Sequence, residues 1–307
     1  MEIKIGTRKS KLAMWQAKYI QELLAKNNIK SKLFPIETKG DKILDRSIAK
    51  IGSKGVFTEE LEEKLLNLEI DIAVHSAKDL QSNLPKDFEI IAFTEREEAN
   101  DVIVSRKPLN PEDKNSSFVL GTSSVRRTSL IKHFFPHLKL TDMRGNLQTR
   151  IKKMDNKDCD GLVLAKAGVL RMGYDDLIVY EFDPEVFIPP VGQGCLAIEA
   201  SKNLPLEIKN KLRKALNSET TEKILLGERQ FLNILEGGCS IPAFCHGILK
   251  NNKVCLKGGI VSTDGQTIVL NDFESENPQE AGTKLASYVL ENGGREILKS
   301  LKSLKNN

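Results

Sequence analysis

Arginine side chains recur at the ends of the strands that the sequence predicts. Only 12 of the 46 basic residues are arginines, so lysine is the usual solvated cation of this chain. Six arginines fall where a predicted strand ends or the next helix begins: Arg8, Arg126, Arg127, Arg144, Arg150 and Arg171. These places bind anions in α/β proteins, and the planar guanidinium group bonds carboxylate or phosphate through two hydrogens. We therefore expect these arginines to bind an anionic ligand.

The segment "GTSSVRR" (121–127) shows this pattern in its most compact form. Thr122 and Ser124 offer hydroxyl groups, and Arg126 and Arg127 lie in the first turn of a predicted helix. Cations there oppose the helix dipole, which favours an anion bound between them. A capped helix with surface arginines explains this segment equally well if it is taken alone, but the recurrence of the pattern favours the anion site.

The segment "DIAVHSAKDL" (71–80) predicts an apolar strand that ends in charged residues. Lys78 and Asp79 follow the strand directly, and nearby positive charges would depress the pKa of Asp79 and keep it ionised at neutral pH. Such a carboxylate suits the stabilisation of a cationic intermediate, or proton transfer to it. A structural Lys78–Asp79 ion pair is the alternative. His75 has no partner at metal-ligand spacing, so we expect a core histidine.

Cys239 lies in the segment "LEGGCSIPAFCHG" (235–247), directly behind two glycines. A catalytic thiol needs a base, and His246, the only nearby histidine, lies seven residues on in a predicted strand. The spacing to Cys245, His246 and Cys255 fits no common zinc pattern. A buried inert thiol is the usual fate of cysteine, whereas a covalent attachment point for a cofactor suits a loop thiol without catalytic partners.

The composition predicts a globular protein of the cytosol. The 307 residues are 40% hydrophobic, and the net charge of +4 arises from 46 basic and 42 acidic residues that are mixed along the chain. Five cysteines without a CxxC pair argue against a disulfide framework. Charges interrupt the first eleven residues, and no stretch reaches the ~20 apolar residues of a membrane span. We expect neither an export signal nor a membrane helix.

Short apolar strands alternate with helical patterns along the first two thirds of the chain. Strands are predicted in "MEIKIG", "KLFPIET" and "IDIAVHS", with helices that begin near Ser10 and span 57–68. The alternation restarts after "DVIVS" near residue 101. Such a series predicts parallel or mixed sheets covered by helices, in two domains of similar size.

The last third of the chain has a different pattern. A helix from about 219 to 235 precedes three short strands, which turn signals at Asn251-Asn252 and Asp264-Gly265 separate. A helix near 278–291 follows. This order predicts a small α+β domain with antiparallel strands.

Eight segments resemble, in this order, the signature segments of the porphobilinogen deaminase family: "IGTRKSKLAMWQA", "KGVFTEELE", "DIAVHSAKDL", "GTSSVRR", "RGNLQTR", "GLVLAKAGVLRMG", "PPVGQG" and "LEGGCSIP". The resemblance runs from about residue 3 to the final helix. It implies two domains like type II periplasmic binding proteins, whose mixed sheets flank a cleft, and a small C-terminal α+β domain. The implied boundaries are 1–95 plus 195–212, 100–190 and 217–307.

The resemblance implies a transferase of porphyrin and haem biosynthesis. The family polymerises porphobilinogen, a pyrrole that bears acetate, propionate and aminomethyl groups, into the linear tetrapyrrole hydroxymethylbilane with loss of ammonia. A dipyrromethane cofactor is attached through a thioether to the cysteine that matches Cys239, and chain growth starts from its free ring. We expect a cytoplasmic monomer without a metal, a nucleic-acid partner or a membrane partner.

The resemblance also assigns roles to individual positions. The aspartate that matches Asp79 is the family's catalytic carboxylate, which stabilises the cation left by the loss of ammonia. Positions that match cofactor-binding residues are Lys78, Asp79, Thr122, Ser124, Arg126, Arg127 and Arg144. Positions that match substrate-binding residues are Arg8, Ser10, Lys54, Arg150, Arg171 and Gln193.

Four positions depart from the family's pattern. Lys39 stands where arginine is common, Ala77 where a larger apolar residue is frequent, Lys166 where a small or apolar residue is common, and Cys195 where alanine is common. These differences concern details of ligand contact and thiol reactivity, and the expected activity does not depend on them.

Two other classes of protein fit the sequence less well. A solute-binding protein for an anionic ligand would share the first two domains, but it would need neither Asp79 nor Cys239. A nucleic-acid-binding protein would need clustered basic residues, and acidic runs such as "TEELEEKLLNLEID" (58–71) interrupt any basic stripe. The chain also has no Walker P-loop and no GxGxxG after its first strand, so nothing supports nucleotide binding.

Overall fold

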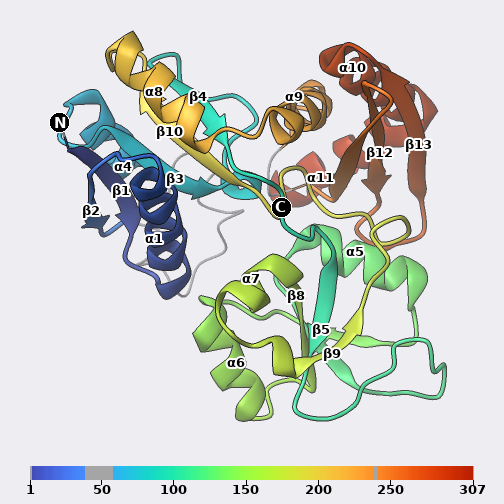
Figure 1. Ribbon diagram of the computed structural model, residues 1–307. Helices are drawn as coiled ribbons and strands as arrows, with labels where there is room; N and C mark the ends of the chain where they lie inside the picture. Colours follow the sequence, from blue (N-terminus) through green and yellow to red (C-terminus); the bar gives the residue numbers. More distant parts are fainter. Residues whose placement is uncertain (1, 39–57, 238–240, 307) are drawn as a thin grey trace. The chain divides into compact units, whose positions relative to one another are not determined.

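The computed structural model of the chain describes residues 2–38, 58–237 and 241–306. The chain forms two compact units, Met1–Glu97 with Gly194–Glu222 and Glu98–Gln193 with Lys223–Asn307 (Figure 1). Lys54 and Cys239, two of the residues expected to function, lie outside the described residues.

A five-stranded mixed sheet forms the centre of the first unit. Its strand order is β2 (Ser31–Ile36), β1 (Ile3–Arg8), β3 (Ile72–Ser76), β10 (Leu196–Ser201) and β4 (Phe88–Phe93). The strand β1 pairs in parallel with β2 and β3, whereas β10 is antiparallel to both β3 and β4. The later segment of the chain therefore inserts a strand into a sheet that the first segment began.

Helices cover both faces of this sheet. Because successive strand residues point to opposite faces, Ile72 and Val74 pack with Ile20 of α1 (Lys11–Lys26) and Leu212 of α8 (Leu206–Leu216). Ala73 points the other way, against Leu61 and Leu65 of α4 (Glu59–Leu66). The helix α1 begins where the sequence predicts, since the Ser10 side chain accepts a hydrogen bond from the Ala13 backbone N–H.

The second unit contains a sheet of the same topology. Its strand order is β7 (Lys139–Thr141), β6 (Val119–Gly121), β8 (Gly161–Ala165), β5 (Asp101–Val104) and β9 (Ile178–Glu181). The strand β6 is parallel to β7 and β8, and β5 is antiparallel to β8 and β9. In both sheets the fourth strand in the order runs against the others.

The two faces of the second sheet also pack against different helices. Ile103 and Val163 contact the side of α5 (Val125–Phe134), with Leu130 and Ile131 in the same core cluster. Val102 and Leu164 point to the opposite face, which α6 (Leu147–Asp155) and α7 (Lys166–Arg171) cover. Asp101 is two residues before Ile103, and its side chain therefore points to the α5 side.

The C-terminal part of the chain is an antiparallel sheet backed by helices. Its strands are β11 (Ala243–Lys250), β12 (Lys253–Val261) and β13 (Ile268–Ser275), and its helices are α9 (Glu219–Ile234), α10 (Pro278–Val289) and α11 (Arg295–Asn306). The predicted Asn251-Asn252 turn joins β11 to β12, with φ values of 50° and 61°. Both values lie in the left-handed region that asparagine tolerates and that tight hairpins require.

The C-terminal sheet shares a hydrophobic core with the rest of the second unit. Phe244 of β11 and Val261 of β12 belong to the same buried cluster as Phe187 and Ile131. This shared cluster explains why residues 223–307 form one compact unit with residues 98–193. The division of the chain into three domains stays a prediction.

The predicted fold class is confirmed: two α/β parts with mixed sheets and a small C-terminal α+β part. The strands β4 and β9 and the helices α7 and α11 were not predicted. The strand β9 has four residues, which is too short for a periodic pattern. No helix within the described ranges is long and apolar enough to cross a membrane.

The helices α9 and α10 approach each other through glycines. A Cβ atom on Gly282 would lie 2.3 Å from the carbonyl oxygen of Gly227. We expect Gly282→Ala to lower the free energy of unfolding by about 1–3 kcal/mol, because the helices must separate to admit the methyl group. Urea unfolding followed by circular dichroism measures this change. The exposed Lys284→Ala on α10 is the control and should change it by less than about 0.5 kcal/mol; equal losses in both variants would contradict the packing argument.

Candidate functional site

A fully buried carboxylate lies between the two arginines of the "GTSSVRR" segment. Asp101, the first residue of β5, is 0% exposed. Its Oδ2 atom lies 2.5 Å from Nη2 of Arg126, and its Oδ1 atom lies 2.7 Å from Nη2 of Arg127. Nε of Arg127 also donates to Oδ1 at 3.2 Å. The anion between the two arginines is therefore a residue of the chain itself.

Further hydrogen bonds fix the direction of each guanidinium group. Nη1 of Arg126 donates to the carbonyl oxygen of Ile188, and Nη1 of Arg127 donates to that of Val163, both at 2.9 Å. The Arg126 guanidinium also lies over the Phe187 ring, 5.7 Å from its centroid. The two side chains are 4% and 8% exposed, so they are parts of the packed interior.

The loop before α5 supports this arrangement. The Ser124 side chain accepts a hydrogen bond from the Arg127 backbone N–H and caps the helix, which agrees with the capped-helix alternative for this segment. The buried Thr122 hydroxyl in turn accepts from the Ser124 backbone N–H at 3.2 Å. The hydroxyl groups of this segment thus stabilise the turn that places both arginines.

Burial and ion pairing act on the pKa of Asp101 in opposite directions. Burial by itself would raise this pKa, but the charges and hydrogen bonds of Arg126 and Arg127 outweigh burial and hold the pKa well below its ordinary value. Burial lowers the pKa of Arg126, and the Asp101 carboxylate opposes that shift. Two guanidinium groups against one carboxylate leave one positive charge in the cluster.

One donor of this cluster is not used. Nε of Arg126 is buried, and within the described ranges it has no hydrogen-bond partner. An unmatched donor in a buried cluster is costly unless a ligand or water satisfies it. The cluster therefore has both the charge and a spare donor for an additional anion.

Gln193 is also part of this cluster. It is 0% exposed, and its Nε2 atom donates to Oδ1 of Asp101 at 2.9 Å and to the carbonyl oxygen of Ala99 at 2.6 Å. The residue lies between Gly192 and Gly194, whose φ values of 75° and 91° require glycine. The segment "PPVGQG" thus brings an amide to the buried carboxylate.

The other three expected arginines of the second unit, Arg144, Arg150 and Arg171, lie on elements other than α5. Arg144 follows β7, and its Nε donates to Oδ2 of Asp142 at 2.7 Å. Arg150 lies in the first turn of α6, and its Nε donates to the carbonyl oxygen of Gly145 at 2.8 Å. Arg171 differs from the prediction that it follows a strand directly: it is the last residue of the short helix α7 and is 9% exposed.

The carboxyl edge of the first sheet presents a second set of expected residues. Because β1 and β3 pair in parallel, Arg8 at the end of β1 and the residues that follow Ser76 share one edge of the sheet. Lys78 and Asp79 lie in the 3₁₀ turn Ala77–Asp79, and the Asp79 side chain is exposed. The Ala77 N–H donates to the carbonyl oxygen of Cys195 at 3.0 Å, which braces the turn.

His75 is buried in the first unit, as a core histidine should be. Its Nε2 atom lies 2.9 Å from Oε2 of the fully buried Glu199, within ion-pair distance although the geometry is not that of an aligned hydrogen bond. Glu62 of α4 lies nearby, and its pKa is raised chiefly by burial. Neither glutamate was predicted from the sequence, because His75 and Glu199 meet through the pairing of β3 with β10, which lie far apart in the chain.

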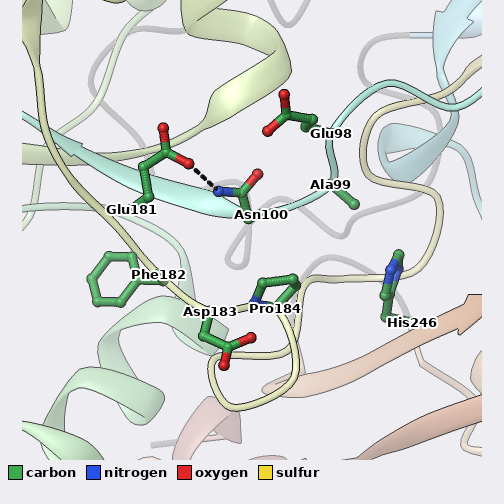
Figure 2. Close-up of a pocket in the computed structure, with 8 residues that line it drawn as sticks. All are labelled: Glu98, Ala99, Asn100, Glu181, Phe182, Asp183, Pro184 and His246. Atoms are coloured by element: carbon green, nitrogen blue, oxygen red, sulfur yellow. Dashed lines mark hydrogen bonds between the residues drawn. The ribbon is translucent and has the colours of Figure 1, made fainter.

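A pocket of the second unit has a volume of about 410 Å³. Its lining, drawn in Figure 2, is acidic and includes Glu98, Glu181 and Asp183. Nζ of Lys166 lies close to Oε2 of Glu98 and 2.7 Å from Oε2 of Glu181. Lys166, which departs from the family's pattern, thus pairs with acidic residues of its own unit. None of the expected site residues that the structure describes lines this pocket, and its acidic lining does not suit an anionic ligand.

Asp101, the buried partner of Arg126 and Arg127, was not predicted from the sequence. Its signal was weak, since it is one acidic residue directly before the apolar run "VIV". No group of three or more potential metal ligands occurs in the part of the chain that the structure describes.

We expect Asp101→Asn to lower the free energy of unfolding by about 3–5 kcal/mol near pH 7, because two guanidinium groups would stay buried without their anion. The folded pKa of Asp101 lies below the unfolded value, so the contribution of the carboxylate is complete above that unfolded value and is lost as the pH falls toward the folded pKa. Urea unfolding should give the same difference between wild type and variant near pH 7 and pH 5, and a smaller one below about pH 4.

The control for this experiment is Asp155→Asn, which removes an exposed ion pair with Arg106. Its effect on the free energy of unfolding should stay below about 1 kcal/mol. A similar, small effect for Asp101→Asn would show that the buried cluster does not depend on the carboxylate.

Two family descriptions match the chain. "Porphobilinogen deaminase, dipyromethane cofactor binding domain" matches residues 3–207, and "Porphobilinogen deaminase, C-terminal domain" matches residues 223–291. The first match contains all the expected site residues that the structure describes. The second contains Cys239.

Relatives named porphobilinogen deaminase are similar to the chain along nearly its whole length. The protein from Desulfosudis oleivorans is 52% identical over 305 residues and covers 98% of both chains. The protein from Cytophaga hutchinsonii is 49% identical over 302 residues, which are 98% of this chain and 97% of the relative.

Among solved structures, the methionine binding protein MetQ aligns with 72% of this chain and 92% of its own at 12% identity and a TM-score of 0.44. Because both family domains and these two relatives match in sequence, the chain belongs to the porphobilinogen deaminase family.

Proposed function

We propose that the chain is a hydroxymethylbilane synthase, which is another name for porphobilinogen deaminase. It condenses porphobilinogen units head-to-tail into hydroxymethylbilane and releases ammonia, as a step of tetrapyrrole biosynthesis. The observation that carries this proposal is the match to both family domains, together with relatives that cover 98% of the chain. The acetate and propionate groups of the substrate fit a site that is rich in arginines.

We assign the dipyrromethane cofactor to a thioether on Cys239 and to the residues around the buried cluster. The cluster of Asp101, Arg126 and Arg127 fits a carboxylate-bearing group, since it keeps one positive charge and the unused Nε of Arg126. The cofactor would also be held by Lys78, Asp79, Thr122, Ser124 and Arg144. When bound, it supplies a pyrrole ring with a free position at which the chain of rings can grow.

The Asp79 carboxylate is assigned the catalytic role. It is exposed on a turn braced by the Ala77–Cys195 hydrogen bond, so it can reach a ligand without unfolding of the turn. When the carbon–nitrogen bond of the aminomethyl group breaks, ammonia leaves with the bonding electrons and the pyrrole of the substrate becomes cationic. A fixed carboxylate stabilises this charge as it develops.

The remaining polar residues are assigned to substrate binding: Arg8, Ser10, Lys54, Arg150, Arg171 and Gln193. The Nε atom of Arg150 donates to the Gly145 carbonyl oxygen, and its planar guanidinium group is of the kind that binds carboxylates through two hydrogens. Gln193 also donates to Asp101, so it holds that carboxylate in place in addition to the substrate-binding role assigned to it.

The proposal includes further assignments. The chain acts as a monomer in the cytoplasm, needs no metal and binds neither nucleic acid nor membrane. Its domains are 1–95 with 195–212, 100–190 and 217–307. The first carries Asp79, the second carries the arginines and the third carries Cys239.

Intact-protein mass spectrometry tests the cofactor assignment. The purified chain should carry an added mass of two linked pyrroles, and Cys239→Ser should lack it and consume no porphobilinogen, because serine forms no thioether. Cys255→Ser is the matched control, since its partly exposed thiol lies on β12. It should keep the adduct and the activity. An active wild type without the adduct would refute the cofactor assignment.

The role of Asp79 is tested by Asp79→Asn, which keeps the size of the side chain and removes its charge. We expect porphobilinogen consumption to fall by at least about 10²-fold, because the developing cation loses its carboxylate. The rates of wild type and variant should be compared at equal concentrations of the protein that carries the adduct. The exposed Asp87→Asn is the control and should leave the rate unchanged. If Asp79→Asn retained the wild-type rate, the carboxylate would have no catalytic role.

A further inference from the structure

Glu228 of α9 is a buried carboxylate that binds two backbone amides from distant segments. It is 0% exposed. Its Oε2 atom accepts from the N–H of Gly192 at 2.9 Å, and its Oε1 atom accepts from the N–H of Gly247 at 2.8 Å. Nδ1 of His246 lies 4.0 Å from Oε1. The carboxylate thus joins three segments of the second unit: α9, the loop before Gln193 and the strand β11.

The two backbone N–H groups that Glu228 binds each need an oxygen acceptor. The N–H groups of Gly192 and Gly247 are donors in buried backbone, and each would be costly without a partner. A carboxylate accepts at both oxygens, whereas an amide would present its NH₂ group to one of the two N–H groups. Hydrogen bonds to an ionised acceptor are also the stronger kind. The position therefore favours glutamate over glutamine of the same size.

The loop that Glu228 holds leads directly to the arginine cluster. Gly192 has a φ value of 75°. The next residue, Gln193, donates to Oδ1 of Asp101, and this same oxygen accepts from Nε and Nη2 of Arg127. A continuous path of hydrogen bonds and one covalent link therefore joins Glu228 to Arg127. At the other end, α9 closes at Ile234, five positions before Cys239.

We propose that Glu228 is a positioning residue, which orients Gln193 and thereby the Asp101, Arg126 and Arg127 cluster on which ligand binding depends. This inference depends on the proposed function, because it concerns the same arginines. Glu228 touches neither substrate nor cofactor in this role. By accepting from the Gly192 N–H, Glu228 fixes the backbone before Gln193, so that the Gln193 side-chain amide points toward the Asp101 carboxylate.

The test is Glu228→Gln in the full chain, purified with its adduct. Loss of one charge-assisted hydrogen bond should raise the KM for porphobilinogen by about tenfold, with kcat of the adduct-bearing fraction changed by less than about threefold. In a sample with nitrogen-15-labelled arginine, the Nε–H signal of Arg127 should shift. A purely structural role would lower the Tm and move neither of these readouts.

The matched control is Gln230→Ala on the same helix, which removes a hydrogen bond to Thr283. It should leave KM and the Arg127 signal at their wild-type values. If Glu228→Gln lowers the Tm but keeps the wild-type KM and Arg127 signal, the inference is wrong.

Glu228→Asp is the second variant, to be used if the glutamine variant does not fold. Its shorter carboxylate can reach only one of the two amides, and the same increase in KM is expected. In wild type, the Gly192 amide should exchange its hydrogen slowly, and rapid exchange would overturn the inference. A wild type that carries no adduct and consumes no porphobilinogen would instead refute the proposed function, so the two failures are distinguishable.

Discussion

The burial of Asp101 between two guanidinium groups is the interaction on which the second unit depends. An isolated carboxylate in a protein interior costs several kcal/mol, so this one is stable only with Arg126 and Arg127 in place. The two buried guanidinium groups in turn require the Asp101 carboxylate, because they would otherwise be buried without an anion. The start of β5, the first turn of α5 and the loop at Gln193 must therefore form together. One positive charge remains in this structural cluster, and that charge favours the binding of anions.

The shared topology of the two sheets explains why this cluster lies at the carboxyl edge of its parallel strands. In each sheet the antiparallel strand starts where its parallel neighbour ends: Asp101 of β5 pairs with Ala165 of β8, and Leu196 of β10 pairs with Ser76 of β3. The first residues of β5 and β10 consequently lie at the carboxyl edges that ligands favour in α/β proteins. Segments that pass from one unit to the other thus also supply polar groups to these edges.

Local features of the fold could be predicted because their causes are local. Ser10 caps a helix as expected, and the Asn251-Asn252 hairpin turn follows from the φ values that asparagine tolerates. The same reasoning could not find β9, whose four residues carry no measurable period. It also could not find the role of Lys166, because the two acidic residues that pair with it lie 68 and 15 positions away in the chain.

The sequence by itself determined the family, the mixed α/β class and the places where arginines gather, because periodicity and motif order depend only on neighbouring residues. Only the tertiary structure decided which anion lies between Arg126 and Arg127. A bound ligand was expected between these two arginines, and Asp101, 25 positions before Arg126 in the chain, lies between them instead. The physical reason is that strand register, and not spacing along the chain, selects the partner of a buried charge. The contacts of Glu228 could not be predicted for the same reason, since its two amide partners lie 36 and 19 positions away in the chain.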